Sequence, residues 1–250
     1  MANNGMYVAT SGILTNILDL QTVAENLANV NTVGFKENIQ ANATMEQWSM
    51  FRNRGGVSTP IGGMGNEVIS ATHYRNWADG GILHTGTLTD FALSGQGFFT
   101  IGLPNGTVAY TRDGSFTLGP TGTLLTQNGN EVLSTTGAPI VLAPGSFTVD
   151  SAGNVSQNGT VIAQIGLASF AQPNLLTPGQ NNLFTAPAGV VATASTATVM
   201  QGYLEQSNVN IAGQISQMIQ GETGMQGDAS VLKVVDNMNA SSVQVGYNQV

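Results

Sequence analysis

Two stretches at opposite ends of the chain place apolar residues at alternating spacings of four and three, the repeat of a helix that packs along one face. In the N-terminal stretch the repeat positions are Ile13, Ile17, Leu20, Ala24 and Leu27. In the C-terminal stretch they are Ile211, Ile215, Met218, Met225, Ala229 and Leu232, with Glu222 within the series. One such stripe is typical of a helix on a globular core. Two matched stripes with little helical periodicity between them favour N- and C-terminal α-helices, in residues 1–35 and 201–250, that pair as a coiled coil.

The central part of the chain, residues 72–200, carries short runs rich in β-branched and aromatic residues. These runs cover residues 98–103, 107–111, 115–118, 123–126, 140–142, 147–149 and 160–170. Between them lie the pairs Asn105-Gly106, Asp113-Gly114, Asn128-Gly129 and Asn158-Gly159. Such pairs supply the positive φ angles of tight hairpins, so the pattern predicts a central antiparallel all-β domain and an α+β fold. Residues 36–71, with Gly, Pro and Ser gathered in 52–66, are predicted to be an extended linker or loop region.

Charge is scarce in this chain and limits what it can bind. Charged residues make up 8% of the sequence and the net charge is −8, against about 25% charged residues in ordinary soluble domains. No basic residue lies between Arg112 and Lys233, so the basic face of a nucleic-acid-binding protein is missing. The absence of cysteine excludes disulfides and thiolate metal sites.

Membrane and export signals are also missing from the sequence. No run of 18 apolar residues is present, so no transmembrane span is expected. The first five residues lack a basic segment, and we therefore expect no cleaved signal peptide.

The sequence contains no recognisable catalytic or cofactor-binding motif. His73 and His84 lack the spacing of a metal-ligand pair and are interpreted as polar loop or strand residues. The Gly95-Gln96-Gly97 segment lacks the third glycine of a dinucleotide loop, and a strand is predicted after it instead of a helix. The glycines in residues 62–65 are not followed by the Lys-Ser or Lys-Thr of a phosphate loop. We expect no enzymatic activity, no catalytic residue, no cofactor and no metal site.

Four segments resemble the bacterial flagellar axial proteins, the family of rod and hook proteins. Residues 26–36 read Asn-Leu-Ala-Asn-Val-Asn-Thr-Val-Gly-Phe-Lys, and residues 90–99, 109–116 and 201–210 match further motifs in the same order. The residues that carry the resemblance are Asn26, Asn29, Asn31, Thr32, Gly34, Phe35, Gly97, Phe98, Tyr110, Arg112, Gly114, Ser207, Asn208, Val209 and Asn210. One departure lies at residues 220–227, where three glycines replace a polar stretch with Arg and Tyr.

The resemblance implies a structural subunit of the flagellar rod, of the proximal or distal type. It implies a homo-oligomer in an open helical assembly that transmits torque, with the helices in an inner layer and the β domain outside. The implied partners are other rod and hook proteins and the flagellar export apparatus, with peptidoglycan or bushing-ring proteins as further candidates and no nucleic acid. The implied location is the basal body in the cell envelope, reached without a cleaved signal peptide.

Three alternatives stay open at this point. A secreted β-domain adhesin or binding module with helical ends would keep its β domain exposed and monomeric. A hook-type axial subunit would share the family motifs. An inhibitor or chaperone would bind export substrates through its helices.

Overall fold

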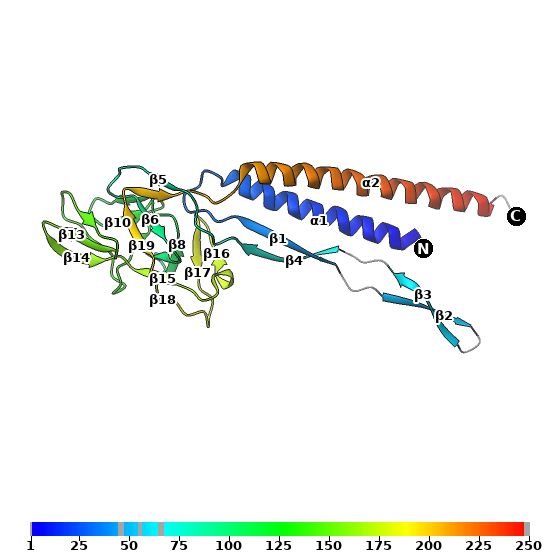
Figure 1. Ribbon diagram of the computed structural model, residues 1–250, viewed down its shortest axis with the longest axis horizontal. Helices are drawn as coiled ribbons and strands as arrows, with labels where there is room; N and C mark the ends of the chain where they lie inside the picture. Colours follow the sequence, from blue (N-terminus) through cyan, green and yellow to red (C-terminus); the bar gives the residue numbers. More distant parts are fainter. Residues whose placement is uncertain (1, 45–47, 55–56, 65–67, 248–250) are drawn as a thin grey trace. The chain divides into compact units, whose positions relative to one another are not determined.

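The computed structural model describes residues 2–44, 48–54, 57–64 and 68–247, in the order helix, strands, helix (Figure 1). These residues form two compact units. The first comprises Met1–Leu27, Asn38–Tyr74 and Asn210–Val250, and the second comprises Ala28–Glu37 and Arg75–Val209. The α+β class, with terminal helices and a central antiparallel β domain, is confirmed.

The N-terminal helix α1 spans Ala2–Ala28 and therefore ends well before residue 35. The segment after it is rich in Asn and Thr, whose short polar side chains compete with helical hydrogen bonds. The Thr32 N–H donates to the Asn29 carbonyl at 3.1 Å, and the Thr32 hydroxyl donates to Asn29 Oδ1 at 3.1 Å. Gly34 then adopts φ +64°, a left-handed conformation that glycine accepts without strain.

The C-terminal helix α2 spans Ile211–Tyr247 without a break. Asn210 caps its first turn, because its Oδ1 accepts a hydrogen bond from the Gly213 N–H at 3.2 Å. An Asn at this position satisfies one of the amide groups that a helix start leaves without a partner. The family motif therefore ends where the helix begins.

The glycines inside α2 have a packing role. Each disfavours a helix by about 1 kcal/mol relative to Ala. A Cβ atom at Gly221 would lie 3.2 Å from the Leu20 side chain, and one at Gly224 would lie 3.1 Å from the Asn16 side chain. Gly227 has no neighbouring atom within 4 Å of such a Cβ. Of the three glycines in residues 220–227, Gly221 and Gly224 thus make room for α1.

Residues 36–71 differ from the predicted linker, because most of them form paired strands. Strand β1 (Asn38–Thr44) pairs with β4 (Val68–Arg75), and β2 (Trp48–Arg54) pairs with β3 (Val57–Met64) in an antiparallel ribbon. The register of that ribbon shifts after Met50, opposite Pro60. A proline lacks the N–H of a strand residue and is tolerated at such a bulge, so the Pro and Gly content did not prevent strand formation.

The remaining strands lie in the second unit and pair in antiparallel fashion. The largest sheet has the order β16-β17-β8-β7-β11-β10-β9, with β15 pairing to β7 and β18 to β15. The smaller sheets are β12-β13-β14, β6-β19 and β5-β20. The strands are β5 (Ile82–His84), β6 (Phe91–Ser94), β7 (Phe98–Gly102), β8 (Val108–Thr111), β9 (Phe116–Leu118), β10 (Leu124–Thr126), β11 (Glu131–Val132), β12 (Thr148–Val149), β13 (Asn154–Gln157), β14 (Thr160–Gln164), β15 (Leu167–Ser169), β16 (Thr177–Pro178), β17 (Leu183–Thr185), β18 (Thr193–Ala194), β19 (Thr198–Gln201) and β20 (Tyr203–Glu205). One 3-10 turn, Pro173–Leu175, precedes β16.

Two of the predicted runs change in the structure. Residues 140–142 contribute only an isolated bridge at Val141. The run 160–170 is divided into β14 and β15 at Gly166, where a Cβ atom would overlap the Thr100 hydroxyl. The chain must approach β7 closely here, and glycine permits that approach.

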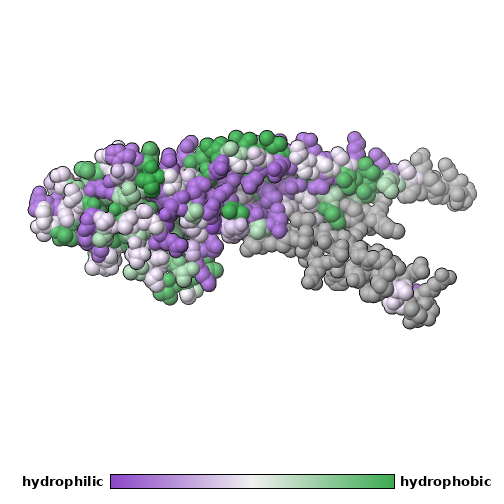
Figure 2. Space-filling model, in the orientation of Figure 1, coloured by the Kyte–Doolittle hydropathy of each residue, from purple (hydrophilic) through white to green (hydrophobic). Residues whose placement is uncertain are grey.

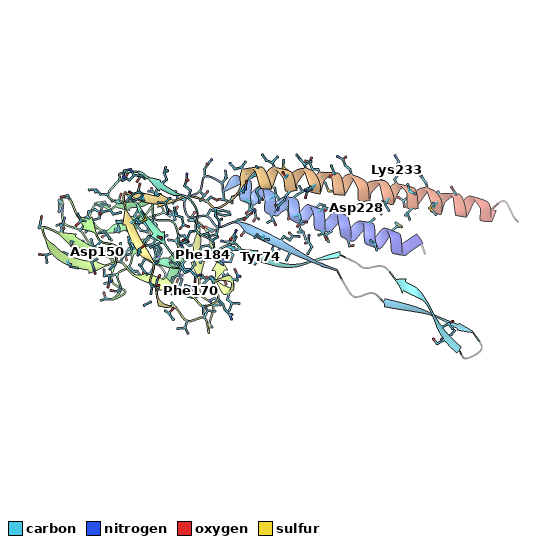
Figure 3. The ribbon with its side chains drawn as sticks, viewed as in Figure 1. Tyr74, Asp150, Phe170, Phe184, Asp228 and Lys233 are labelled. Carbon is cyan, nitrogen blue, oxygen red and sulfur yellow. The ribbon has the colours of Figure 1, made fainter. Side chains whose placement is uncertain are left out.

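Two apolar clusters form the core of the second unit. The larger one gathers the buried residues Phe91, Leu93, Phe99, Ile101, Ala109, Phe116, Leu124, Val132, Ile140, Leu142, Phe147, Val155, Ile165, Ala197 and Val199. The smaller one consists of Phe98, Ala168, Phe170, Leu176 and Phe184, with Trp77 and Tyr110 packed against it. Phe170 and Phe184 are labelled in Figure 3. Neighbouring phenylalanines in β7 face opposite sides of the strand, and they therefore belong to different clusters.

Three of the four predicted turn glycines have positive φ, namely Gly106, Gly129 and Gly159. Gly114 does not, so the hairpin interpretation of Asp113-Gly114 was wrong. A Cβ atom at Gly114 would lie 1.8 Å from the Phe91 carbonyl oxygen. This glycine allows two backbone segments to touch, which a local turn pattern cannot reveal.

Replacing Gly34 should destabilise the fold far more than replacing a turn glycine such as Gly106. A Cβ atom at Gly34 would lie 2.5 Å from the Arg112 carbonyl group, and this overlap adds to the left-handed penalty. We expect Gly34→Ala to lower the free energy of unfolding by at least about 3 kcal/mol. Gly106→Ala, with φ +79° and no atom within 4 Å, should cost about 1–2 kcal/mol. Urea denaturation of both variants measures the difference, and equal losses would contradict this role of Gly34.

Candidate functional site

Segments from three family motifs meet at one buried carboxylate, that of Glu205 in β20. Lys36 Nζ lies 2.5 Å from Glu205 Oε1, and Arg112 Nη1 lies 3.2 Å from Oε2. The Gly80 N–H donates to Oε1 at 2.9 Å. The side chains of Lys36 and Glu205 are fully buried. A buried carboxylate is tolerated only when charges and hydrogen bonds satisfy its oxygens, so this cluster holds distant segments together.

Arg112 connects this cluster to the motif of residues 90–99. Its Nη2 donates to the Gly95 carbonyl at 2.8 Å, and its guanidinium carbon lies 5.5 Å from the centre of the Phe98 ring. Asp79 accepts a longer bond of 3.4 Å from Nη1. The Arg112 side chain is 2% exposed and that of Asp79 is 44% exposed. Glu205 is therefore the buried counterion of Arg112, and Asp79 is a weaker one near the surface.

Burial lowers the pKa of the Lys36 ammonium, and the neighbouring Glu205 carboxylate opposes this shift. Since the folded chain loses this proton more readily than the unfolded chain, burying the ammonium opposes folding at neutral pH. Glu205 and the Ala78 carbonyl, 2.7 Å from Nζ, offset part of this cost. The buried Lys36 ammonium therefore depends on the Glu205 carboxylate.

Gly34 and Gly97 each lie against another segment of the chain. The Gly34 N–H donates to the Glu205 carbonyl at 2.7 Å. At Gly97 a Cβ atom would overlap the Ser195 hydroxyl, which donates to the Gln96 carbonyl at 2.7 Å. Both glycines therefore occupy positions where another segment passes too close for a side chain.

The Asn208 side chain joins two other segments, that of Glu37 and that of Asn76 and Ala78. Its Oδ1 accepts from the Glu37 N–H at 2.8 Å. Its Nδ2 donates to the Asn76 and Ala78 carbonyls at 2.8 and 2.9 Å. Beside it, the Val209 N–H donates to the Ser207 hydroxyl oxygen at 3.3 Å. The family motif of residues 207–210 thus consists of linking and capping residues.

The other motif residues have structural roles as well. Phe35 is buried, while Asn31 is exposed. Tyr110 packs its ring edge-on against Phe170, with ring centres 4.8 Å apart, and burial raises the pKa of the Tyr110 hydroxyl. Asn26 bonds to the backbone of Asn38 in both directions, at 2.8 Å each.

The predicted seam residues divide into two groups. Half-buried are Ile13, Leu20, Leu27, Met218, Met225 and Leu232. Exposed are Ile17, Ala24, Ile211, Ile215 and Ala229. The more buried face of α2 is shifted from the predicted one and consists of Gln214, Met218, Gly221, Met225, Asp228, Leu232 and Val235. It keeps the spacing of four and three but includes polar residues and a glycine, and the role of the seams in assembly stays a prediction.

Sequence reasoning did not single out Lys36, Asp79 or Glu205. One signal was present, because Glu205 is the only charged residue between Asp150 and Glu222. An isolated charge in a long neutral segment is often buried with a partner, since exposed surface normally carries several charges. The partners themselves come from distant segments and depend on the fold.

The part of the chain that the structure describes contains no group of three His, Asp or Glu side chains that could hold a metal ion. His73 is exposed on β4, and the His84 ring packs at a tilt of 57° against Tyr203, with ring centres 4.8 Å apart. A polar cavity of about 480 Å³ is lined mainly by Asn, Thr and Gly residues, together with Arg75 and Asp113. Neither described helix is long and apolar enough to cross a membrane.

Removing the buried Glu205 carboxylate should destabilise the fold far more than removing the exposed Asp79 carboxylate. We expect Glu205→Ala to lower the free energy of unfolding by about 3–5 kcal/mol, because it leaves two buried cations uncompensated. Asp79→Ala should cost under about 1 kcal/mol, as is usual for an exposed partner. Chemical denaturation of the full chain measures both values. Similar losses for the two variants would show that burial does not govern this cluster.

Two aspartates should respond to pH in opposite directions. Burial raises the pKa of Asp113, and repulsion from Asp90 adds to the shift. Hydrogen bonds from Asn154 and the Ala152 N–H lower the pKa of Asp150. A raised pKa means that the folded chain holds the proton more tightly, so ionised Asp113 opposes folding at neutral pH.

We therefore expect Asp113→Asn to raise the melting temperature at pH 7. The gain should shrink as the pH falls through the raised pKa of folded Asp113 and should be gone below about 4, the usual value for an unfolded aspartate. Asp150→Asn should lower the melting temperature at pH 7, and this loss should fade as the pH falls below about 4 through the lowered pKa of folded Asp150. Thermal unfolding followed at pH 7, about 3.5 and about 2 separates the two. A pH-independent change in either variant would refute the electrostatic cause.

Three family models match successive parts of the chain. A model described as Flagella basal body rod protein matches residues 6–36. One described as Flagellar hook protein FlgE/F/G D1 domain matches residues 92–163. One described as Flagellar basal body rod FlgEFG protein C-terminal matches residues 200–245. Together they cover α1, much of the β domain and α2.

Curated proteins are similar over nearly the whole length. The flagellar basal-body rod protein FlgG of Borreliella burgdorferi is 33% identical, with 93% of this chain and 95% of that protein covered. FlgF of Rhizobium meliloti is 36% identical over 86% of each chain. FlgF of Caulobacter vibrioides is 35% identical, with 94% and 93% covered. This chain belongs to the family of flagellar basal-body rod proteins.

Proposed function

We propose that this chain is a structural subunit of the bacterial flagellar rod that assembles with copies of itself. The observation that supports this most directly is the surface of α2, where large apolar side chains face solvent (Figure 2). Ile211, Ile215 and Ile219 are 49%, 41% and 54% exposed. Exposed apolar rows of this kind mark surfaces that bind other proteins.

The exposed residues form two rows on opposite flanks of the more buried face of α2. Ile211, Ile215 and Ile219 recur every four residues along one flank. Val231, Val234 and Met238 lie along the other flank in the second half of the helix, given 3.6 residues per turn. Two separate rows let one helix contact two different neighbours. Contacts of this heterologous kind generate an open helical assembly where the rotation between neighbours does not close into a ring.

In this assembly the terminal helices form an inner layer as coiled coils, and the β domain forms an outer layer. Torque from the motor passes to the hook and filament through many packed contacts, without chemistry at any of them. The matched families describe rod and hook proteins, and none of them is catalytic. The scarcity of charge agrees with a surface that is mostly interface, since interface cores are depleted in charge.

The proposed location is the basal body in the cell envelope. The subunit reaches it through the flagellar export apparatus without a cleaved signal peptide, and its neighbours there are other rod and hook proteins. Relatives named FlgG and FlgF match at similar identity, and the proposal includes both the proximal and the distal rod type. The adhesin and the export-substrate chaperone have no support among the relatives.

The apolar rows should be required for assembly but not for folding. We expect Ile215→Asp with Ile219→Asp to abolish filaments or tubes, because each buried carboxylate costs far more than an isoleucine contact contributes. Val191→Asp, which places the same charge at a 75% exposed site of the β domain, should leave assembly intact. Electron microscopy and sedimentation of the purified proteins measure assembly.

The same experiment distinguishes a rod subunit from a monomeric adhesin. A monomeric binding module would form no filaments in any variant, and the helix substitutions would change nothing that sedimentation detects. Filaments that persist in the double variant would show that these rows are not the contact surface.

A further inference from the structure

The contacts between α1 and α2 are unusual because two of them are polar and one is fully buried. Asn26 Nδ2 donates to Gln214 Oε1 at 3.1 Å, and these residues are 1% and 2% exposed. Asn16 Nδ2 donates to Asp228 Oδ2 at 3.3 Å, and Asp228 is labelled on α2 in Figure 3. These two pairs are called the polar layers below.

Glycines complete the polar layers. A Cβ atom at Gly12 would lie 2.6 Å from Asp228 Oδ2, and one at Gly224 would lie 3.1 Å from Asn16 Nδ2. Asp228 and Asn16 thus each approach the opposite helix where it has no side chain. Gly221 admits Leu20 in the same way. The contacts define one antiparallel alignment, in which residue numbers rise along α2 as they fall along α1.

Apolar residues alone would not select this alignment. Ile13, Ile17, Leu20, Ala24 and Leu27 follow a heptad repeat, and a slip of seven residues would place Ile13, Ile17 and Leu20 where Leu20, Ala24 and Leu27 now lie. The half-buried Met218 and Met225 add little selectivity, because methionine adapts its shape to its surroundings. A slip would, however, remove Asn26 from Gln214 and leave buried polar groups without partners. Such groups penalise the wrong alignment.

We propose that the polar layers Asn26–Gln214 and Asn16–Asp228 determine the register of α1 against α2, with Gly12, Gly221 and Gly224 admitting the interlocking side chains. Polar groups inside an apolar helix contact are a known means of fixing register at the expense of stability. Asn26 has a second function here. Its side chain donates a hydrogen bond to the Asn38 carbonyl and accepts one from the Asn38 N–H. Asn26 therefore links the register of the helices to strand β1.

The absence of cysteine from the chain permits a direct test by disulfide formation. The pair Leu20→Cys with Gly221→Cys reports the observed register. The pair Ile13→Cys with Gly221→Cys, combined with Leu20→Ala so that the new side chain at residue 221 does not meet Leu20, reports a slip of seven residues. Both pairs are placed in the full chain and oxidised, and the disulfide yield is scored in the monomer fraction, so the result does not depend on filament formation.

In the parent chain we expect the 20–221 disulfide to exceed the 13–221 disulfide by about tenfold or more, the ratio that one buried unsatisfied polar group produces. In a variant with Asn16→Leu, Asn26→Leu, Gln214→Leu and Asp228→Leu, the two yields should become similar. The helix signal in circular dichroism should be retained. A ratio that stays near tenfold in this variant would overturn the proposal.

Two further variants keep the test decisive if the fourfold variant does not fold. Asn16→Leu with Asp228→Leu removes only the second layer, leaves the Asn26 contacts in place and should lower the ratio partly. Exchanging the second layer, with Asn16→Asp and Asp228→Asn, keeps one amide and one carboxylate and should restore the parent ratio. Failure of the exchange to restore it, or no change on removing the layer, would refute a role for that layer.

Discussion

The β domain depends on a single buried anion, the Glu205 carboxylate. It is neutralised by Lys36 and Arg112 and hydrogen-bonded to the Gly80 backbone, so four segments far apart in the sequence must meet for it to be stable. A buried ion pair contributes little net stability compared with an apolar contact, but a missing member is very costly. The cluster therefore destabilises any conformation in which one of these partners is missing. Its charges are compensated only when the segments of Lys36 and Arg112 both lie against β20.

This cluster uses a large share of the few charged residues in the chain. Of six basic residues in the chain, two are committed to this cluster. The remaining surface is largely neutral, and the α2 helix exposes isoleucine and valine beside its few charged residues. The helix contact itself combines half-buried apolar residues with the polar pair Asn26 and Gln214. Exposed apolar residues on the outer face of α2 are expected for a subunit whose helix surface becomes buried in an assembly.

Local sequence patterns predicted much of the fold correctly. The periodic stripes identified both helices, and the Asn-Gly pairs at residues 105, 128 and 158 identified turns, because these signals arise from neighbouring residues. The errors share one cause. The strands in residues 38–71 were missed because Gly and Pro suggested a loop, whereas β1 pairs with β4 and β2 pairs with β3. Gly114 was taken for a turn residue, although its role is to let Phe91 approach.

The sequence by itself determined the order of helices and β domain, the family, and the motif residues, since each depends on residues close together in the chain. Only the tertiary structure decided that Gly34 lies on the Arg112 backbone, that Glu205 is the shared partner of Lys36 and Arg112, and that Gln214, Gly221 and Asp228 face α1 in place of Ile211 and Ile215. These contacts join residues that lie far apart in the sequence. Their geometry depends on which segments pack together, and periodicity within one segment carries no information about its partner.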